Sequence, residues 1–310
     1  MDNPPRVAPV TSAQPTIEPV PTADLDEVLD LIAAEQAHPD RGTTMLGETR
    51  DGIAAELDDL EPDWRGSVRA VREEGRLVAA VLGDWDAELG RAWIHGPWVA
   101  GGDAELWARW SRPLVDAVLA QLPDGVDDWE LAADASHVLM ASLGADLGLS
   151  PSEANHVYTV EAAAVAGWPD PSGEVRPAGV ADRDAVRPLH DQEFPATYAP
   201  VETLLPDPPD GKYVVVVATD GGRLLGYAAG RVQADGEGYL DFIAVSDDAR
   251  GRGTGRDLMA AVCRPVIDAS TTGKLHLTVQ DHRVPARRLY ESLGFVPSLA
   301  IVGYRHRRSV

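Results

Sequence analysis

The chain repeats itself, and this restricts it to two copies of one fold. Four blocks recur in the same order, namely 16–26 with 175–184, 75–78 with 222–225, 112–117 with 264–269, and 147–149 with 293–295. A tyrosine follows the last block in both copies, at Tyr158 and at Tyr304. Matched blocks in one order and at a nearly constant offset indicate two homologous domains.

The boundaries of these domains follow from composition. Residues 167–173 are rich in proline and glycine, which is typical of a linker. We therefore expect a first domain at 16–166 and a second at 174–310. Residues 1–15 contain four prolines and show no periodicity, which predicts a mobile tail.

The apolar pattern of the second domain predicts a mixed α/β fold. Four runs rich in β-branched and aromatic residues are predicted strands, at 213–218, 225–229, 239–245 and 275–279. Helical patterns lie between them, and the first domain repeats the same order. Each domain is therefore expected to be one α/β unit.

The charge is strongly negative and unevenly distributed. The whole chain carries a net charge of −23, and residues 1–160 hold ten arginines, no lysine and thirty acidic residues. Such a surface repels phosphates, so nucleic acid is not an expected partner. The acidic half is either a solubilising surface or an attractant for a cationic substrate, and an anionic ligand belongs in the C-terminal half.

Several other classes of protein are not indicated. No apolar run approaches the length of a membrane helix, and the N-terminus lacks a signal-peptide pattern, so we expect a cytoplasmic protein. The one cysteine, Cys263, follows Ala260, Ala261 and Val262, which predicts a buried, inert helix position. No spacing of His, Cys, Asp or Glu suggests a metal site.

The segment with the clearest chemistry is the glycine-rich turn at 250–255, Arg-Gly-Arg-Gly-Thr-Gly. It lies between a predicted strand that ends at Val245 and an amphipathic helix. Glycines let the backbone bend and bring N–H groups close to a ligand, and the helix N-terminus favours an anion. With its two arginines, the turn predicts a pyrophosphate site, although a glycine-rich connection with solvent-facing arginines would have the same sequence.

Two segments together resemble the GNAT superfamily of N-acetyltransferases. Its acyl-CoA loop reads Arg/Gln-x-x-Gly-x-Gly/Ala between a strand and a helix, and Arg250, Gly253 and Gly255 fill the defined positions. Residues 286–295 are similar to the family's Ala-x-x-Leu-Tyr-x-x-x-Gly-Phe segment. The resemblance covers 173–310 and implies tandem domains, each a mostly antiparallel central sheet flanked by helices, with one splayed strand pair.

The resemblance implies acetyl-CoA as co-substrate. The pantetheine arm would bind the backbone of the strand end, which corresponds to Ile243, Ala244 and Val245. The pyrophosphate would bind the loop residues, which are Arg250, Gly251, Arg252, Gly253, Thr254 and Gly255. The family usually has asparagine where this chain has Arg283, so the tail of CoA can be held differently here.

Two residues are the catalytic candidates. Tyr290 fills the position of the family's tyrosine, which lies near the sulfur and would protonate or hydrogen-bond the departing thiolate. Asp241 leaves the same strand face as Val245, and family members often carry an acid on this strand. Asp241 is either the base that removes a proton from the amine or a structural, substrate-orienting carboxylate.

The acceptor cleft is predicted beside residues 190–198, between the first helices of the second domain. Glu193 could pair with a substrate ammonium, and Phe194 and Tyr198 could form walls. Packing at a helix end, followed by a turn at Pro195, is the alternative for this segment.

The first domain lacks the chemistry of the second. The interval from Val99 to Arg112 is six residues shorter than its counterpart and contains two acids in place of the arginine loop. Gly144 occupies the position of Tyr290. Trp93, Trp98, Trp107 and Trp110 cluster in this part of the sequence and could fill the degenerate site as core. We expect a non-catalytic first domain.

The resemblance thus implies an acetyl-CoA-dependent N-acetyltransferase that acts on a primary amine of a small molecule or peptide, by direct attack. The acceptor could be cationic. The protein would be a monomer, and so a covalent pseudo-dimer, or a homodimer. Two alternatives remain open: a catalytically silent acyl-CoA-binding or sensor module, and a transferase for a longer acyl group.

Overall fold

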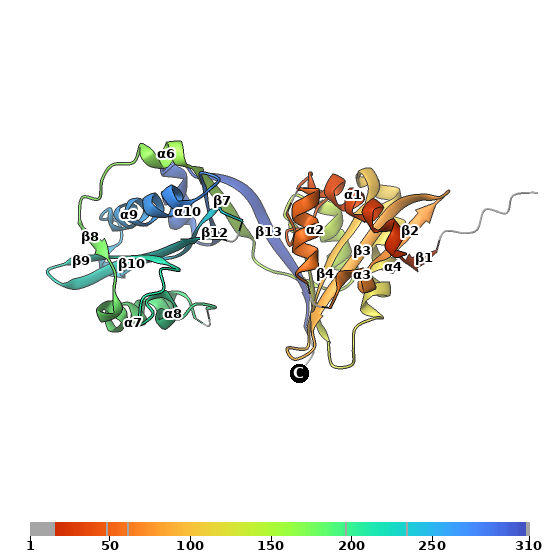
Figure 1. Cartoon of the computed structure of the whole chain (residues 1–310), viewed down its shortest axis with the longest axis horizontal. Helices are drawn as coiled ribbons and strands as arrows, with labels where there is room; N and C mark the ends of the chain where they lie inside the picture. The colour runs from red at the N-terminus through yellow and green to blue at the C-terminus, as the bar shows by residue number, and fades with distance from the viewer. Residues whose placement is uncertain (1–15, 48, 61, 196, 234, 308–310) are drawn as a thin grey trace, which may run out of the picture. The chain divides into compact units, whose positions relative to one another are not determined.

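The computed structural model describes residues 16–307 except 48, 61, 196 and 234, so the predicted tail at 1–15 lies outside the described residues. The chain forms two compact units (Figure 1). Unit 1 contains the described residues up to Ala154 together with those from Ala300 onward, and unit 2 contains Asn155–Leu299. Each unit is a mixed α/β fold, as the sequence predicts.

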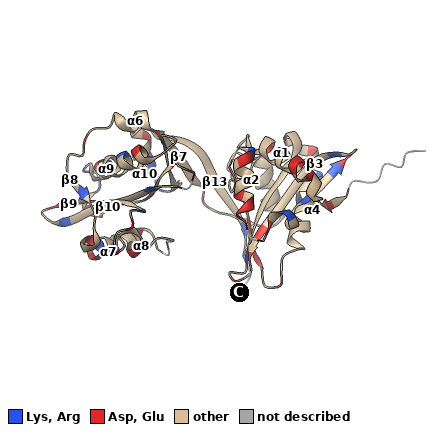
Figure 2. Ribbon diagram, viewed as in Figure 1, with Lys and Arg blue, Asp and Glu red and all other residues tan. Residues whose placement is uncertain are grey.

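Unit 1 is built on an antiparallel sheet with one parallel pair. Its strands follow the order β1-β2-β3-β4-β5, and the end of β13 completes the sheet beside β5. The elements are β1 (Ile17–Pro19), α1 (Leu25–Gln36), α2 (Arg50–Asp58), α3 (Trp64–Ser67), β2 (Arg69–Glu73), β3 (Arg76–Asp86), β4 (Arg91–Val99), α4 (Ala104–Leu119), β5 (Asp128–Asp134), α5 (Val138–Asp146), β6 (Ser150–Pro151) and β13 (Val296–His306). Acidic residues are spread over α1 and α2 (Figure 2).

Unit 2 repeats this plan with the strand order β7-β12-β11-β10-β9-β8. Helices α9 and α10 cover one face of its sheet, and α7 and α8 cover the other (Figure 1). The elements are β7 (Asn155–Glu161), α6 (Ala162–Ala166), β8 (Glu174–Pro177), α7 (Arg183–Glu193), α8 (Val201–Leu204), β9 (Val214–Asp220), β10 (Arg223–Val232), β11 (Gly238–Val245), α9 (Thr254–Ala269), β12 (Lys274–Gln280) and α10 (Val284–Ser292).

The last strand of each sequence repeat pairs with the sheet that is formed mainly by the other repeat. β7 ends the first repeat in sequence, yet it pairs antiparallel with β12, with Tyr158 opposite Leu277. The end of β13 ends the second repeat and pairs with β5, with Tyr304 opposite Leu131. The compact units therefore differ from the predicted boundaries at these strands, because two homologous strands can complete either of two homologous sheets.

The predicted linker is packed against unit 2. The Trp168 side chain is buried, and its Nε1–H donates to the carbonyl of Leu293 at 2.8 Å. Arg264 on α9 donates to the carbonyls of Trp168 and Pro169 and pairs with Asp170 at 2.8 Å. The buried indole and these contacts fix the path of the chain between α6 and β8.

The amphipathic pattern of α9 explains the main core of unit 2. Leu258, Met259, Val262 and Val266 lie on one side of this helix and are buried against the sheet. Cys263 lies fully buried among them, and burial raises the pKa of its thiol, so the predicted core position is confirmed.

The predicted splayed strand pair is present in unit 2. β11 and β12 are parallel and pair at three positions, from Gly238 opposite Leu275 to Leu240 opposite Leu277. Beyond Leu240 the ladder with β12 ends, while β11 continues to pair with β10. A register shift at Asp241 accompanies this separation, because Ala229 faces Phe242 whereas Gly230 faces Leu240. The separation leaves backbone groups of β11 available to a ligand.

None of the helices in the described chain has the length and apolar character that crossing a bilayer demands.

Candidate active site

Two cavities of unit 2 meet where β11 and β12 separate. The first has a volume of about 600 Å³ and lies along the end of β11, the glycine turn and α10. The second has a volume of about 530 Å³ and lies between β11, β12 and the segment after α7. Both cavities are lined by Glu193, Ile243, Arg283, Ala286 and Tyr290. A molecule in one cavity would therefore reach a molecule in the other at Tyr290.

The glycine turn opens onto the first cavity. Gly251 and Gly253 have φ values of 74° and 91°, a region that L-residues with side chains rarely adopt. Gly253 is the N-cap of α9, and within the described chain no side chain caps that helix. The first N–H groups of a helix have no intrahelical acceptor, so they are available to an anion here.

Gly255 is closely approached by a neighbouring side chain, and its backbone does not have a positive φ. A Cβ at this position would lie 3.2 Å from Cδ2 of Leu289 on α10. A side chain would therefore narrow the first cavity between α9 and α10.

The structure places most, but not all, of the predicted cofactor residues on the first cavity. The residues on its lining are Ile243, Ala244, Val245, Arg250, Gly251, Gly253 and Gly255. Arg252 and Thr254 lie outside that lining as the described residues define it; Arg252 is exposed, and the buried Thr254 hydroxyl donates to the carbonyl of Ala249 at 3.4 Å.

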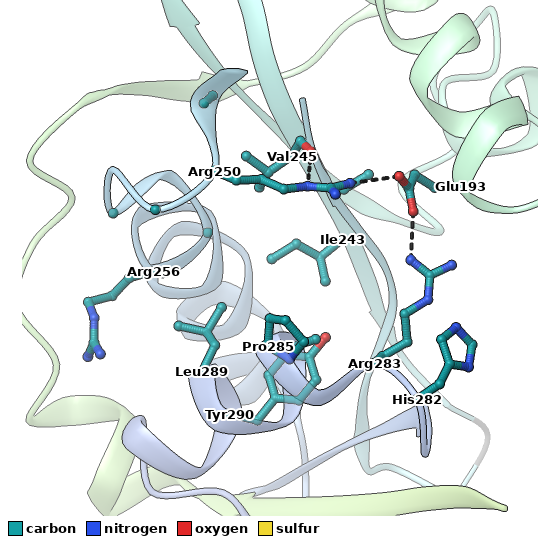
Figure 3. Close-up of a pocket in the computed structure, with 16 residues that line it drawn as sticks. Glu193, Ile243, Val245, Arg250, Arg256, His282, Arg283, Pro285, Leu289 and Tyr290 are labelled. Atoms are coloured by element: carbon teal, nitrogen blue, oxygen red, sulfur yellow. Dashed lines mark hydrogen bonds and ion pairs between the residues drawn. The ribbon is translucent and has the colours of Figure 1, made fainter. Parts of the chain in front are cut away.

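Arg250 connects the glycine turn to the second cavity (Figure 3). Its Nε donates to the carbonyl of Val245 at 3.2 Å, and its Nη2 donates to Oε1 of Glu193 at 2.8 Å. The other oxygen of Glu193, Oε2, accepts from Nη1 of Arg283 at 2.7 Å. Glu193 therefore links two arginines that line the first cavity.

This geometry bears on the predicted role of Glu193. Arg283, then Arg250, hold the pKa of its carboxyl below the ordinary value. Both of its oxygens already accept hydrogen bonds, so this structure does not leave Glu193 free for a substrate ammonium. Phe194 and Tyr198 line the second cavity, where the sequence places them.

Asp241 is a carboxylate buried at the second cavity. Its side chain has 0% exposure, and its Oδ1 accepts from the Tyr198 hydroxyl at 2.5 Å and from Nε of Arg231 at 3.2 Å. Its Oδ2 is buried and has no hydrogen-bond partner among the described residues. Burial raises the pKa of the Asp241 carboxyl above its ordinary value, although Tyr198 and Arg231 oppose this shift.

Tyr290 lies on α10 at the junction of the two cavities. Its side chain is buried, and burial raises the pKa of the phenol, so the hydroxyl keeps its proton at neutral pH. A protonated hydroxyl between two cavities can donate a proton to a group that becomes negative there.

Sequence reasoning missed two residues of this site. Arg256 lines the first cavity from the first turn of α9, and its Nη2 donates to Ser292 at 2.8 Å. Arg231 on β10 pairs with Asp241 across the sheet. The basic residue at 256, directly after the glycine turn, could have been noticed, whereas a cross-strand pair next to a register shift leaves no sequence signal.

The corresponding turn of unit 1 is satisfied by the protein's own carboxylates. The backbone N–H of Gly101, directly after β4, donates to Oε1 of the buried Glu35 at 2.7 Å. The side chain of Asp103 caps α4 and accepts from the N–H groups of Glu105 and Leu106 at 2.8 and 3.0 Å. These acids stand where an anionic ligand would bind.

The position that matches Tyr290 has no room for a side chain in unit 1. A Cβ on Gly144 would lie 2.6 Å from Cδ1 of Tyr304. Of the predicted tryptophan cluster, Trp98 and Trp107 are buried, but they belong to two different core clusters. Trp98, on β4, packs with residues of α1, whereas Trp107 lies on α4. Tryptophan packing thus fills both faces of the unit 1 sheet.

Within the residues that the structure describes, no group of three or more His, Cys, Asp or Glu side chains is placed to hold a metal ion.

In unit 2, a splayed parallel strand pair opens onto a glycine-rich helix start, as the predicted resemblance implies. Residues 183–295 match the model of the Acetyltransferase (GNAT) family. This part of unit 2 is therefore similar to a GNAT acetyltransferase domain, and the predicted resemblance is confirmed. No curated protein matches the chain.

Solved structures of GNAT proteins resemble the whole chain. A GCN5-related N-acetyltransferase from Sphaerobacter thermophilus is 18% identical, with a TM-score of 0.63 over 97% of this chain and 98% of that one. A tandem GNAT protein from the clavulanic acid biosynthesis pathway is 18% identical, with a TM-score of 0.54 over 96% and 100%. At these identities the likeness shows the fold, and it extends over both units.

Proposed function

We propose that unit 2 transfers an acetyl group from acetyl-CoA to a primary amine of a small molecule or peptide. The observation that carries this proposal is the meeting of two cavities at Tyr290, with the unpartnered oxygen of Asp241 beside the second. One cavity would hold the acyl donor and the other the amine. The GNAT family match supports this reaction class.

The first cavity suits acetyl-CoA. The separated end of β11 offers the backbone of Ile243, Ala244 and Val245 to the pantetheine arm. The N–H groups of the glycine turn and α9 offer a pyrophosphate site. Apolar contact comes from Pro285, Ala286 and Leu289 on the opposite wall.

Arg250 would change partners when the donor binds. Its side chain is 53% exposed, and its pairs with Glu193 and Asp247 are surface ion pairs, each worth about 0–1 kcal/mol. A pyrophosphate is a stronger partner for a guanidinium, because charge-assisted bonds to phosphate are often bidentate. Glu193 would then stay paired with Arg283.

The amine would lose its proton to Asp241. An ammonium has no lone pair, so it must be neutral before it attacks the thioester carbonyl. Oδ2 of Asp241 has no hydrogen-bond partner among the described residues and would accept that proton once the amine or a bridging water reaches it, while Tyr198 and Arg231 hold Oδ1. The raised pKa of the carboxyl brings it closer to the range in which an acid-base group works near neutral pH.

The thiolate would take its proton from Tyr290. Attack of the amine forms a C–N bond, and the C–S bond then breaks to release CoA as a thiolate. The Tyr290 hydroxyl, whose pKa burial raises, donates its proton to that sulfur. Attack leaves a second proton on the amine nitrogen, which is lost as the amide forms. One of the two amine protons replaces the proton that Tyr290 gave to sulfur, and the other returns to solvent, so protons balance over a turnover.

Unit 1 would provide structure rather than a second site. Glu35 and Asp103 already occupy the backbone N–H groups near its matching turn. The chain is therefore proposed to bind one acetyl-CoA and to act as a pseudo-dimer with a single active site.

The direct test is a screen of amines with acetyl-CoA, read by CoA release and by the mass of the product. Polyamines, aminoglycosides, amino acids and peptides with free N-termini cover the acceptor class, including cationic members. Acetyl transfer to an amine supports the proposal. Saturable acetyl-CoA binding with no transfer to any amine favours a silent acyl-CoA-binding module instead.

A further inference from the structure

The helix that carries Tyr290 contributes one buried side chain to the core, while Ala286 and Leu289 pack against that core only partly buried. α10 has nine residues, and among them only Tyr290 is buried. A catalytic group has to be held within about 0.5 Å of its working position to be effective. Contacts from neighbouring elements are therefore needed to hold α10 in position.

The hydroxyl of Tyr158 on β7 forms hydrogen bonds with two residues of α10, one before and one after Tyr290. This hydroxyl donates to Oε1 of Glu291 at 2.9 Å and accepts from Nε of Arg287 at 3.2 Å. These partners are four residues apart on α10, so the two bonds span one helical turn that contains Tyr290. The Tyr158 side chain is 1% exposed.

The rings of Tyr158 and Phe295 both pack against the Tyr290 ring. The centroid distances from Tyr290 are 6.2 Å to Tyr158 and 5.9 Å to Phe295, both in tilted arrangements. Trp168, from the segment between the repeats, continues the cluster at 6.1 Å from Phe295. Tilted aromatic pairs at such distances are favourable and limit the movement of the ring.

The same strand also fixes the turn before α10. Asp281 accepts from Nη1 of Arg287 at 2.6 Å and lies 2.7 Å from Nε2 of His156, which is also on β7. Arg283, which lines both cavities, lies two residues after Asp281. β7 thus contacts both the helix and the turn that border the proposed active site.

We propose that Tyr158 is a positioning residue for Tyr290, so that the last strand of the first repeat is a working part of the active site in unit 2. This inference rests on the proposed acetyl transfer. The degenerate repeat then has two roles, because it folds as unit 1 and also supplies the strand that orients the proton donor.

The repeat provides a matched control. Tyr304 on β13 is the counterpart of Tyr158 on β7. In unit 1 the Tyr304 ring packs on Gly144, which is the position that corresponds to Tyr290. Tyr158→Phe and Tyr304→Phe each remove one hydroxyl from a buried tyrosine of a last strand. Only Tyr158→Phe removes hydrogen bonds to α10.

The experiment is a double-mutant cycle in the full-length protein with Tyr158→Phe and Tyr290→Phe. We expect Tyr158→Phe to lower kcat at least about fivefold with the KM for acetyl-CoA unchanged, because small misplacements of a catalytic group reduce turnover strongly. In the Tyr290→Phe background the same change should lower kcat less than about twofold, because there is no hydroxyl left to position. Tyr304→Phe should leave kcat unchanged.

An equal loss of kcat in both backgrounds, or no loss in either, overturns the role of Tyr158. Amide hydrogen exchange over residues 284–292 provides a measurement that does not depend on activity. Tyr158→Phe should accelerate that exchange and Tyr304→Phe should not; unchanged exchange also overturns the proposal. Absence of acetyl transfer by the wild-type chain, with accelerated exchange in Tyr158→Phe, would instead contradict the proposed function alone.

Discussion

The backbone N–H of Gly101 donates a 2.7 Å hydrogen bond to the carboxylate of Glu35 inside unit 1. Gly101 follows β4 as the glycine turn of unit 2 follows β11. Together with the Asp103 cap of α4, Glu35 gives unit 1 its own anions at the place where unit 2 presents an open turn. The backbone N–H groups at this turn therefore donate to the protein's own carboxylates in unit 1, whereas in unit 2 no described side chain caps the helix.

This difference predicts the stoichiometry of acetyl-CoA binding. Calorimetric titration of the full-length chain should give one acetyl-CoA per chain, because the bound carboxylates of unit 1 repel a pyrophosphate. A second saturable site that survives Arg250→Glu would show that unit 1 binds acetyl-CoA as well.

The two arginines of the turn should differ in their effect on the affinity for acetyl-CoA. Arg250→Glu and Arg252→Glu make the same change of charge two residues apart, but only Arg250 lines the first cavity. Arg250→Glu should weaken acetyl-CoA binding about tenfold to hundredfold, the value of a charge-assisted bond of about 1.5–3 kcal/mol. Arg252→Glu should have a much smaller effect, which calorimetry at fixed ionic strength can measure. Equal losses would mean that only the net charge of the turn matters.

Much of this site could be predicted from the sequence, because its parts are local. The strand that ends at Val245, the turn and the helix after it are contiguous, and the predicted strands fall within β9, β10, β11 and β12 or within one residue of them. Tyr290 is identified by a motif whose residues are contiguous in the sequence.

The parts that the sequence could not predict depend on contacts between distant segments. The pairing of β7 with β12 could not be foreseen, because either homologous strand fits either sheet. The neutralisation of Glu193 by Arg250 and Arg283 joins residues that lie 57 and 90 positions apart. Arg252 is exposed between two glycines with positive φ, a backbone conformation that no local sequence pattern specifies.

Asp241→Asn should separate catalysis from stability. The asparagine retains an oxygen for Tyr198 and Arg231 but cannot take a proton from the amine. We expect kcat to fall about 10²–10⁴-fold, the usual contribution of a general base. The acid limb of the wild-type kcat/KM profile, which should lie above the ordinary aspartate pKa of 3.8, should disappear in the variant.

The same substitution should not destabilise the fold. Because the pKa of Asp241 is raised in the folded state, its stabilising contribution is present at low pH and is lost as the pH rises through the raised value. The ionised carboxylate thus opposes folding at pH 7. Thermal unfolding at pH 7 should give Asp241→Asn a Tm no lower than that of the wild type; a clear decrease would show that the ion pair with Arg231 outweighs burial.

Tyr290→Phe tests the proton donor. It should lower kcat about 10²-fold while the affinity for acetyl-CoA stays the same, because the lost hydroxyl acts on the leaving thiolate and not on the bound thioester. Pre-steady-state CoA release, with binding measured by calorimetry, separates the two quantities. Unchanged turnover would remove Tyr290 from the reaction.

The buried His137 should make the folding stability of unit 1 decrease at low pH. Burial lowers the pKa of His137 from 6.5 to about 4. Between these two pH values the imidazole is therefore mostly neutral in the folded state and mostly protonated in the unfolded chain. Its contribution to stability is present above pH 6.5 and is lost as the pH falls towards 4, with a total of roughly 3 kcal/mol.

The matching variant is His137→Asn. The side chain of His137 accepts from the N–H of Met140 at the start of α5, and asparagine is a good residue at such a position. Thermal unfolding between pH 4 and 7 should show a shallower loss of stability in this variant than in the wild type. An identical pH dependence would assign acid sensitivity to other groups.

Transfer of an acetyl group from acetyl-CoA to an amine by unit 2 can be measured directly. The measurement is single-turnover transfer of isotope-labelled acetyl from acetyl-CoA, with the amine products identified by mass, for the wild type and for Asp241→Asn combined with Tyr290→Phe. We predict labelled N-acetyl product with the wild-type chain and its loss in the double variant, while both proteins still bind one acetyl-CoA. Binding of acetyl-CoA without labelled product on any amine, or equal product with both proteins, would contradict the proposed reaction.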